Sequence, residues 1–331
     1  MLRPGQHDEQ RQRWTECLIR ELGETIVGAL RDDDVVEVLL NPDGRIWLDS
    51  RTEGMYDSGA RLLPQEAEAI LASIAGMLGT QIDAEHPIIE AELPLDGSRI
   101  EGMVPPLVAS PSFAIRKRAS RVFPLSHYIE SGSMTAAQAE ALRQAIGERR
   151  NILVSGGTGS GKTTLVNAIL DEMVRLGEPC ERFILLEDTV ELQCTAENHT
   201  ALRTTRHVDL AMLVKATMRL NPDRIIIGEV RGREALDLLK AWNTGHPGGC
   251  TTVHANNAAA ALLRLDHLAQ EAGVPSQRAL IAETVGLVVH IEGGSRGRRV
   301  TELVRVAGLA GDGTFQLEPT AARTSEEERR S

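Results

Sequence analysis

One stretch, GGTGSGKTT over residues 156–164, constrains the fold of this chain most strongly. It fits the pattern G-x-x-x-x-G-K-[ST], follows the apolar run 152–154 and precedes a helical pattern over residues 165–173. Glycines let the backbone curl so that several N–H groups point at the phosphates of a nucleotide, and the positive end of the following helix strengthens that attraction. The stretch therefore predicts a phosphate-binding loop between a strand and a helix.

The polar residues of the loop have separate expected roles. Lys162 is expected to neutralise the oxygens of the β- and γ-phosphates, and Thr163 to ligate Mg²⁺ through its hydroxyl. The alternative is a glycine-rich turn with a chance lysine, and the flanking strand and helix patterns argue against it. The predicted ATP-binding loop comprises Gly156, Gly157, Thr158, Gly159, Ser160, Gly161, Lys162, Thr163 and Thr164.

The chain divides into two predicted domains. Its 331 residues exceed the usual size of a single hydrophobic core. Residues 1–122 predict a small α+β domain, and residues 123–134 lose periodicity and predict a linker. Residues 135–310 alternate short apolar runs with helical patterns, which predicts a doubly wound, mostly parallel sheet. The end of the chain, residues 311–331, predicts a disordered tail.

Composition narrows the function classes. The formal net charge of -11 argues against a body that coats nucleic acid, because such binding needs Lys and Arg to neutralise phosphates. The four cysteines stand singly, without a C-x-x-C pair, so a reduced cytoplasmic protein is expected. No run of about 18 apolar residues occurs, so any membrane association is expected to be peripheral or through partners.

Two predicted strand ends supply acids for metal binding and water activation. Glu229 follows one strand, and because a glycine occupies the place where P-loop enzymes usually have an aspartate, Glu229 is expected to reach Mg²⁺ through water. Glu187 and Asp188 follow another strand, at the edge where open α/β sheets place their ligands, and Glu187 is the predicted catalytic base. The alternative is that these acids cap loops or pair with Arg224 and Arg231.

Two histidines lie within the segment TGHPGGCTTVHA, which runs into a strand expected to end beside the phosphate loop. His246 and His254 are eight residues apart, a spacing that does not suit a compact metal site. Sensing of the γ-phosphate by hydrogen bonding is the functional interpretation, and a structural role is the alternative. Lys162 is the basic residue of the phosphate loop. Arg99 and Arg116 lie in the first domain, and their residue type by itself indicates only solvent-exposed surface arginines.

Four motifs together resemble those of the secretion-ATPase superfamily, which drives type II secretion, type IV secretion and type IV pili. In chain order they are GGTGSGKTT, ILLEDTVEL, NPDRIIIGEVRG and TGHPGGCTTVHA. The earlier segments DGSRIEGMVPP and SFAIRKRAS are similar to the conjugal-transfer branch of type IV secretion. Type II assembly ATPases commonly carry a four-cysteine zinc module, and its absence from this sequence favours the type IV branch.

The resemblance implies a RecA-like motor domain that hydrolyses ATP with Mg²⁺ in a homohexameric ring, with the nucleotide between the two domains of a subunit. It assigns Lys162 and Thr163 to the phosphates and the metal. It assigns Glu229 to the Mg²⁺ shell and Glu187 to water activation. It also places His246 and His254 in the histidine box of the family.

The resemblance changes the interpretation of the arginines. Arg99 and Arg116 match amino-domain arginines that reach the γ-phosphate, and Arg203 and Arg206 fall where some relatives place intersubunit arginines. The implied mechanism is ATP-driven closure of the two domains. Implied partners are inner-membrane components of a secretion or conjugation channel, with the protein cytoplasmic and peripheral to the inner membrane. Direct nucleic-acid binding is not expected, because the chain is acidic and only 3% of its residues are aromatic. A DNA translocase or helicase, and a nucleotide-switched scaffold without turnover, are the alternatives.

Overall fold

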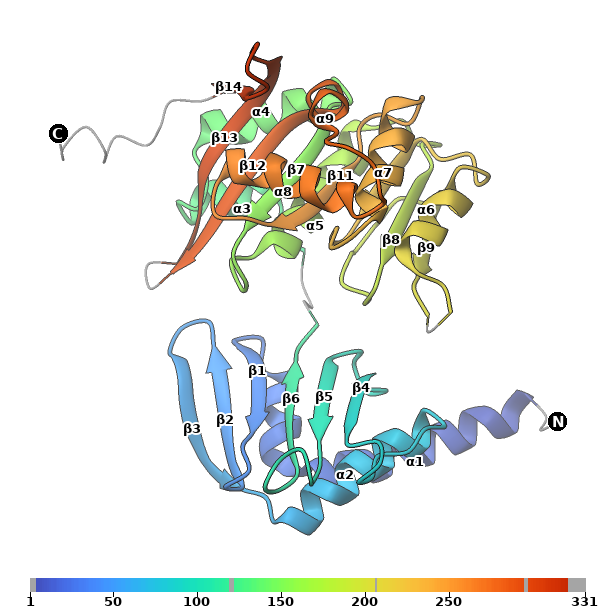
Figure 1. Cartoon of the computed structure of the whole chain (residues 1–331). Coiled ribbons are helices and arrows are strands. Elements are labelled where there is room, and N and C mark those ends of the chain that lie inside the picture. Colours follow the sequence, from blue (N-terminus) through green and yellow to red (C-terminus); the bar gives the residue numbers. More distant parts are fainter. Residues whose placement is uncertain (1–3, 119–121, 206, 295–296, 321–331) are drawn as a thin grey trace. The chain divides into compact units, whose positions relative to one another are not determined.

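The computed structural model describes residues 4–118, 122–205, 207–294 and 297–320, with side chains from residue 13 onward. The chain separates into two compact units, Met1–Ser120 and Arg121–Ser331 (Figure 1). Each unit has its own hydrophobic core. The division lies near the predicted domain boundary at residue 122.

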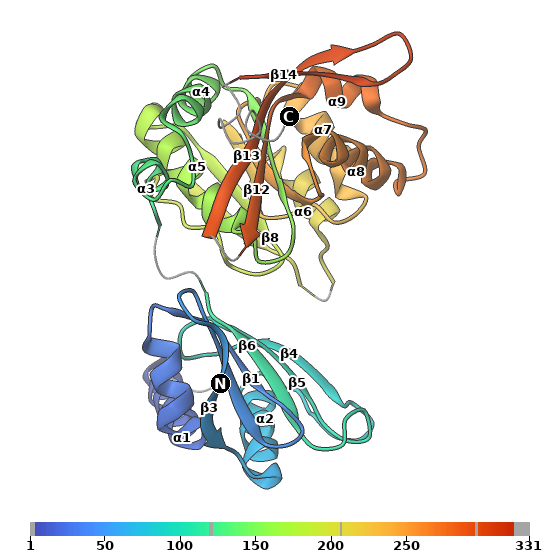
Figure 2. The ribbon, with the colours of Figure 1, turned by 90° about the vertical axis from the view of Figure 1, so that its left-hand side faces the viewer.

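Within the described part of unit 1, six strands form an antiparallel sheet in the order β3-β2-β1-β6-β5-β4. The strands are β1 Val35–Leu40, β2 Arg45–Ser50, β3 Gly54–Arg61, β4 Ile88–Glu92, β5 Arg99–Met103 and β6 Ser112–Arg116. The helices are α1 Pro4–Arg31 and α2 Pro64–Met77. Both helices cover the same face of the sheet (Figure 2).

Alternation along these strands separates an apolar face from a charged one. Ile100 and Ile115 are paired across β5 and β6 and are buried against the helices. Their neighbours Arg99 and Arg116 therefore point to the opposite face, where they are also paired in register. Glu37 of β1 is the next partner of Arg116. The two arginines thus lie side by side at the charged face of the unit 1 sheet.

In unit 2 the described strands form one sheet in the order β14-β13-β12-β7-β11-β10-β8-β9. The strands are β7 Asn151–Gly156, β8 Phe183–Glu187, β9 His199–Arg203, β10 Arg224–Ile227, β11 Cys250–His254, β12 Val285–Gly294, β13 Gly297–Leu309 and β14 Phe315–Pro319. Pairing is parallel from β12 through β7 to β9, and antiparallel between β12, β13 and β14.

Helices cover both faces of this sheet (Figure 2). One face packs against α3 Leu125–Glu130, α4 Ala136–Gly147 and α5 Lys162–Leu176. The other packs against α6 Leu210–Thr217, α7 Glu234–Asn243, α8 Ala258–Gln270 and α9 Arg278–Thr284. Central strands such as β7 are buried on both sides, which explains their continuous apolar runs. The predicted doubly wound α/β architecture is confirmed.

Two segments differ from the prediction. The expected linker 123–134 contains α3, whose Leu125 and Tyr128 are buried in the core of unit 2 because their spacing puts both on one helical face. The expected disordered tail 311–331 begins with β14, where Phe315 and Leu317 alternate onto the core. Residues 321–331 lie outside the described residues. Both corrections concern short elements that depend on contacts with distant parts of the chain.

Candidate active site at the phosphate loop

The phosphate loop joins the end of β7 to the start of α5, as the sequence predicts. Gly159 has φ +70° and Gly161 has φ +95°, a left-handed region that favours glycine. A Cβ at Gly156 would lie 2.3 Å from the carbonyl oxygen of Ile291 on β12. The glycines are therefore required both by the curl of the loop and by the close approach of a neighbouring strand.

Lys162, the first residue of α5, is held inside the loop. Its side chain is buried, and Nζ donates hydrogen bonds to the carbonyl oxygens of Gly156 at 3.0 Å and Gly157 at 2.8 Å. Nζ also lies 3.2 Å from Nδ1 of His254, at the end of β11. The ammonium group is thus fixed at the loop by backbone oxygens, where it can bind phosphate oxygens.

A polar chain, defined here as Lys162, His254, Glu229 and Arg231, continues from the loop. Nε2 of His254 lies 2.9 Å from Oε1 of Glu229, which follows β10. Oε2 of the same carboxylate accepts a hydrogen bond from Nη2 of Arg231 at 2.8 Å. Since β7, β11 and β10 are neighbours in the sheet, their carboxyl ends bring these residues together. Glu229 and His254 therefore lie where the sequence places them, and Glu229 also makes the arginine pair considered as its alternative.

Glu187 lies in a different environment. Its side chain is buried, and Oε1 accepts backbone N–H groups from Glu191 at 2.8 Å and Leu192 at 2.7 Å. Gly228 lies beside this side chain, and a Cβ there would be in ordinary van der Waals contact, 3.4 Å from Cγ of Glu187. The carboxylate thus caps the loop that follows β8, which is the alternative stated for this residue. Asp188 is the next residue and is half-buried.

His246 lies away from the phosphate loop. Its Nδ1 is 2.7 Å from the carbonyl oxygen of Pro222, before β10 begins, whereas His254 ends β11. The five residues of β11 span roughly 13 Å, so the two histidines lie beyond opposite ends of that strand. The expectation that both sense the same γ-phosphate is corrected for His246, because His254 ends β11 at the phosphate loop whereas His246 precedes the start of that strand and contacts Pro222.

The predicted arginines are distributed over both units. Arg203 ends β9 at the edge of the unit 2 sheet, where it is exposed and in register with Glu187. Arg206 lies outside the described residues. Arg99 and Arg116 belong to unit 1, and they are the paired arginines of its charged face. Their approach to the phosphate loop stays a prediction.

The structure adds two residues that sequence reasoning missed. His290 on β12 is buried, and its Nδ1 lies 2.9 Å from Oγ of Ser155, the residue before Gly156. Burial lowers the pKa of His290, and the carboxylates of Glu302 and Glu292 oppose that shift. Within the apolar run VGLVVHIEGG a single histidine gives no signal of this contact. The second missed residue, Arg298 of β13, lies against the loop.

The donor groups at the loop suit Mg²⁺. This ion prefers oxygen ligands and usually takes only one or two protein groups beside phosphate oxygens and waters. The hydroxyl of Thr163 and the carboxylate of Glu229 would supply those groups. Among the residues described, no cluster of three His, Cys, Asp or Glu residues could hold a metal ion by itself.

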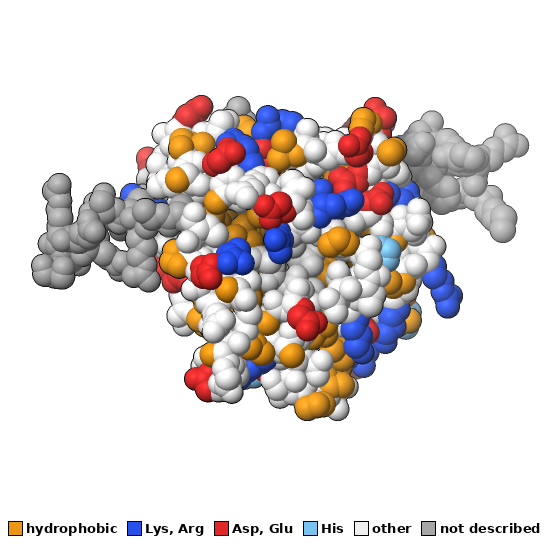
Figure 3. Space-filling model, turned by 90° about the horizontal axis from the view of Figure 1, so that it is seen from above, with side chains coloured by type: hydrophobic (Ala, Val, Ile, Leu, Met, Phe, Trp, Pro, Cys, Tyr) orange, Lys and Arg blue, Asp and Glu red, His pale blue; other side chains and the backbone are white. Residues whose placement is uncertain are grey.

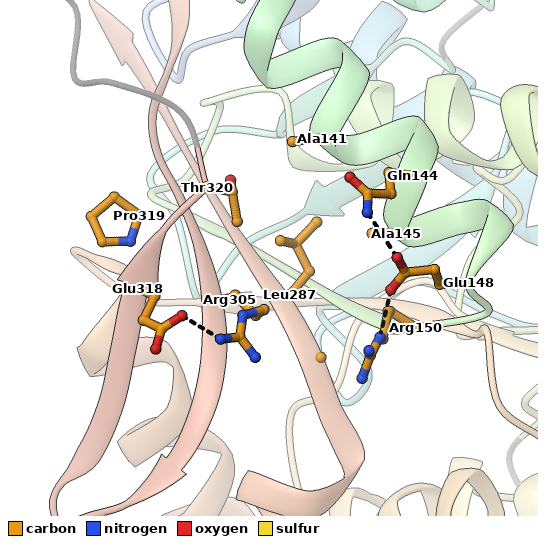
Figure 4. A pocket seen from close by; sticks show the side chains of 11 residues that line it. Ala141, Gln144, Ala145, Glu148, Arg150, Leu287, Arg305, Glu318, Pro319 and Thr320 are labelled. Atoms are coloured by element: carbon orange, nitrogen blue, oxygen red, sulfur yellow. Dashed lines mark hydrogen bonds and ion pairs between the residues drawn. The ribbon is translucent and has the colours of Figure 1, made fainter.

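A cavity of about 260 Å³ lies elsewhere in unit 2 (Figure 4). One of its lining residues is Leu287, near the start of β12, and Leu287 pairs with Ile152 near the start of β7. The phosphate loop follows the other end of β7, so the cavity and the loop lie at opposite ends of these strands. Two ion pairs border it, Arg150 with Glu148 and Arg305 with Glu318. It contains none of the predicted site residues.

On the face seen from above, acidic and basic side chains are interspersed over most of the surface (Figure 3).

No helix in the described part of the chain is both long and apolar enough to cross a membrane.

The chain is similar to known proteins over most of its length. Residues 61–292 match the family model for type II/IV secretion system proteins. The chain is 49% identical over 308 residues to a probable conjugal transfer protein TrbB of Sinorhizobium fredii, covering 93% of this chain and 94% of the relative. It is 52% identical over 287 residues to the conjugal transfer protein TrbB of Rhizobium radiobacter, covering 87% and 88%.

A solved structure with a similar fold is that of the Legionella pneumophila ATPase DotB. Its TM-score is 0.63 at 20% sequence identity, with 84% of this chain and 79% of that chain covered. This likeness concerns the fold.

The buried His290 predicts a pH dependence of stability. Its pKa is lowered from the ordinary value of 6.5, so the unfolded chain takes up a proton first as the pH falls below that value. Stability from His290 is thus present above about pH 6.5 and lost at lower pH. We expect His290→Gln to reduce the difference in unfolding midpoint between about pH 7.5 and about pH 5.5. Fluorescence of Trp242, with Trp14 and Trp47 replaced by Phe, reports unfolding of unit 2.

His267→Gln is the matched control, because His267 is exposed on α8. This variant should keep the wild-type pH dependence. An equal pH dependence in His290→Gln and in the wild type would contradict the prediction.

Proposed function

The chain belongs to the type II/IV secretion system protein family, and on that premise we propose that it hydrolyses ATP to energise a type IV secretion or conjugative transfer apparatus. The observation that carries this proposal is the phosphate loop with Lys162 held inside it beside His254 and Glu229. The TrbB relatives, which match along nearly their whole length, support the conjugative setting.

The loop residues would first bind and orient the nucleotide. Backbone N–H groups of the loop and the start of α5 would receive the phosphates, and Lys162 would exchange its bonds to Gly156 and Gly157 for phosphate oxygens. Bound Mg²⁺ would neutralise charge on the β- and γ-phosphates, held by Thr163 and, through water, by Glu229. Because Lys162 is already placed at the loop, little rearrangement accompanies binding.

We assign the orientation of the attacking water to Glu229 in place of Glu187. In Glu187 one carboxylate oxygen is committed to two backbone N–H groups and the side chain is buried. Glu229 is 19% exposed and is linked through His254 to Lys162. In the reaction the water oxygen bonds to the γ-phosphorus, the bond to the β–γ bridging oxygen breaks, and the water proton passes to the Glu229 carboxylate. ADP and inorganic phosphate are the products.

Arg99 and Arg116 are proposed to bind the γ-phosphate when the two units close on ATP. Their register supports this role, because paired residues in an antiparallel sheet have Cα atoms about 5 Å apart and one anion can contact both side chains. Arg116 is exposed on the charged face. Glu37, whose pKa burial raises and Arg116 lowers, stands beside it and balances the charge while no phosphate is present.

The proposed assembly is a homohexameric ring in the cytoplasm, peripheral to the inner membrane and attached to channel components. A ring would turn closure of the units into work on that channel. We expect light scattering of the full chain with a nonhydrolysable ATP analogue to give the mass of six subunits. A monomer at every nucleotide and protein concentration would contradict the ring.

The ATPase proposal predicts two different losses at the loop. Lys162→Ala should lose ATP affinity and turnover together, because the cation that holds the phosphates is removed. Glu229→Gln should keep most of the ATP affinity, because the glutamate contacts Mg²⁺ only through water, and lower turnover by at least about 100-fold, because water orientation is removed. Phosphate release and binding of a nonhydrolysable analogue measure the two quantities.

The controls are Glu187→Gln and Lys240→Ala. Lys240 is exposed on α7, so its loss should change neither quantity. If Glu187→Gln lost more turnover than Glu229→Gln at equal ATP affinity, the orientation of the attacking water would be assigned to Glu187. Wild-type turnover in Lys162→Ala would refute the ATPase assignment.

The closure proposal predicts that Arg116→Ala lowers turnover by at least about tenfold while ADP affinity stays unchanged, because the γ-phosphate contact is lost. Steady-state phosphate release and ADP titration measure the effect. Arg61→Ala is the matched control, since Arg61 is exposed at the end of β3 in the same unit. An unchanged rate in Arg116→Ala would contradict the clamp.

A further inference from the structure

The β12–β13 hairpin lies directly against the phosphate loop. Gly293 of β12 pairs with Arg298 of β13, and a Cβ at Gly293 would lie 3.1 Å from Cα of Ser160. A Cβ at Gly161 would lie 2.7 Å from Cδ and 3.1 Å from Nε of Arg298. The guanidinium of Arg298 is therefore stacked on the residue that precedes Lys162, at the amino end of α5.

The strand order places Arg298 and the groups expected at the γ-phosphate on opposite sides of β7. The groups expected at the γ-phosphate, His254 and Glu229, follow β11 and β10 on one side of β7. Arg298 comes from β13, two strands away on the other side of β7. A polyphosphate that crosses the end of β7 with its γ-phosphate near His254 has its α-phosphate on the side of Arg298.

The local charges favour an anion at this position. The amino end of α5 carries a partial positive charge, and Lys162 adds a full one. Arg298 places a further guanidinium against the same helix end, where an anion can contact it. Burial raises the pKa of Tyr128 on α3, and the charge of Arg298 opposes that shift.

We propose that Arg298 binds the α-phosphate of the nucleotide and so contributes equally to the affinity for ADP and for ATP. The proposal rests on the ATPase function proposed above and adds a residue to the same site. Arg298 lies in unit 2 with the loop, so its contact does not require closure of the units. Arg298 would then retain ADP after the γ-phosphate has left.

Calorimetric titration of the full chain with Mg-ADP and with a nonhydrolysable Mg-ATP analogue tests the proposal. Arg298→Ala should raise Kd for both nucleotides by roughly tenfold or more and by the same factor, because a charge-assisted hydrogen bond to phosphate is lost. Arg298→Lys should recover part of the affinity. Arg299→Ala is the matched control, since its exposed side chain leaves β13 on the opposite face.

The outcomes separate this proposal from the function on which it rests. Unchanged affinity in Arg298→Ala, or a loss confined to the triphosphate, would overturn the α-phosphate contact while leaving the ATPase intact. A loss accompanied by a lowered Tm and not recovered by Arg298→Lys would overturn it too, because Arg298 would then only brace the loop. Failure of the wild type to bind either nucleotide would refute the ATPase function itself.

Discussion

The close approach of β12 to the phosphate loop is the constraint on which the site depends. The carbonyl oxygen of Ile291 occupies the space of a Cβ at Gly156, and Ser160 lies against the backbone of Gly293. A loop with larger residues at these points could not curl between β7 and α5 and also pack on the neighbouring strand. Burial of β7 in the middle of the sheet thus fixes where the loop amides point, and the groups that follow the adjacent strands meet there.

The sequence predicts those parts of the site that depend on local pattern. The loop, Glu229 and His254 follow from strand ends, because parallel strands bring their carboxyl ends to one edge. His246 fails the same reasoning, since its strand starts after it and it lies at the other edge. Arg298 has no local signal at all, because its place comes from an antiparallel hairpin that packs beside β7. The positions of such residues are set by contacts between segments that are distant in the sequence.

Glu187 and Glu229 show why a strand end alone does not assign a chemical role. Glu187 ends β8 and Glu229 follows the neighbouring parallel strand β10, and both side chains carry a carboxylate. Backbone N–H groups of Glu191 and Leu192 turn one of them into a loop cap, whereas a histidine and an arginine keep the other at the site. A carboxylate with two backbone donors on one oxygen is stabilised where it is, and moving it to bind a water would break both bonds.

In the proposed mechanism, the arginines of the two units have two different tasks. The nucleotide must stay bound to one unit while the other unit moves away, because otherwise each opening would release the nucleotide. As proposed, Arg298 would act from the unit that contains the loop and would not distinguish ADP from ATP, whereas Arg99 and Arg116 would act from the other unit and would need the γ-phosphate. On this proposal, loss of the γ-phosphate would remove the attraction between the units without removing the nucleotide from its loop. Opening and ADP release would then be successive steps, with ADP release governed by contacts within unit 2.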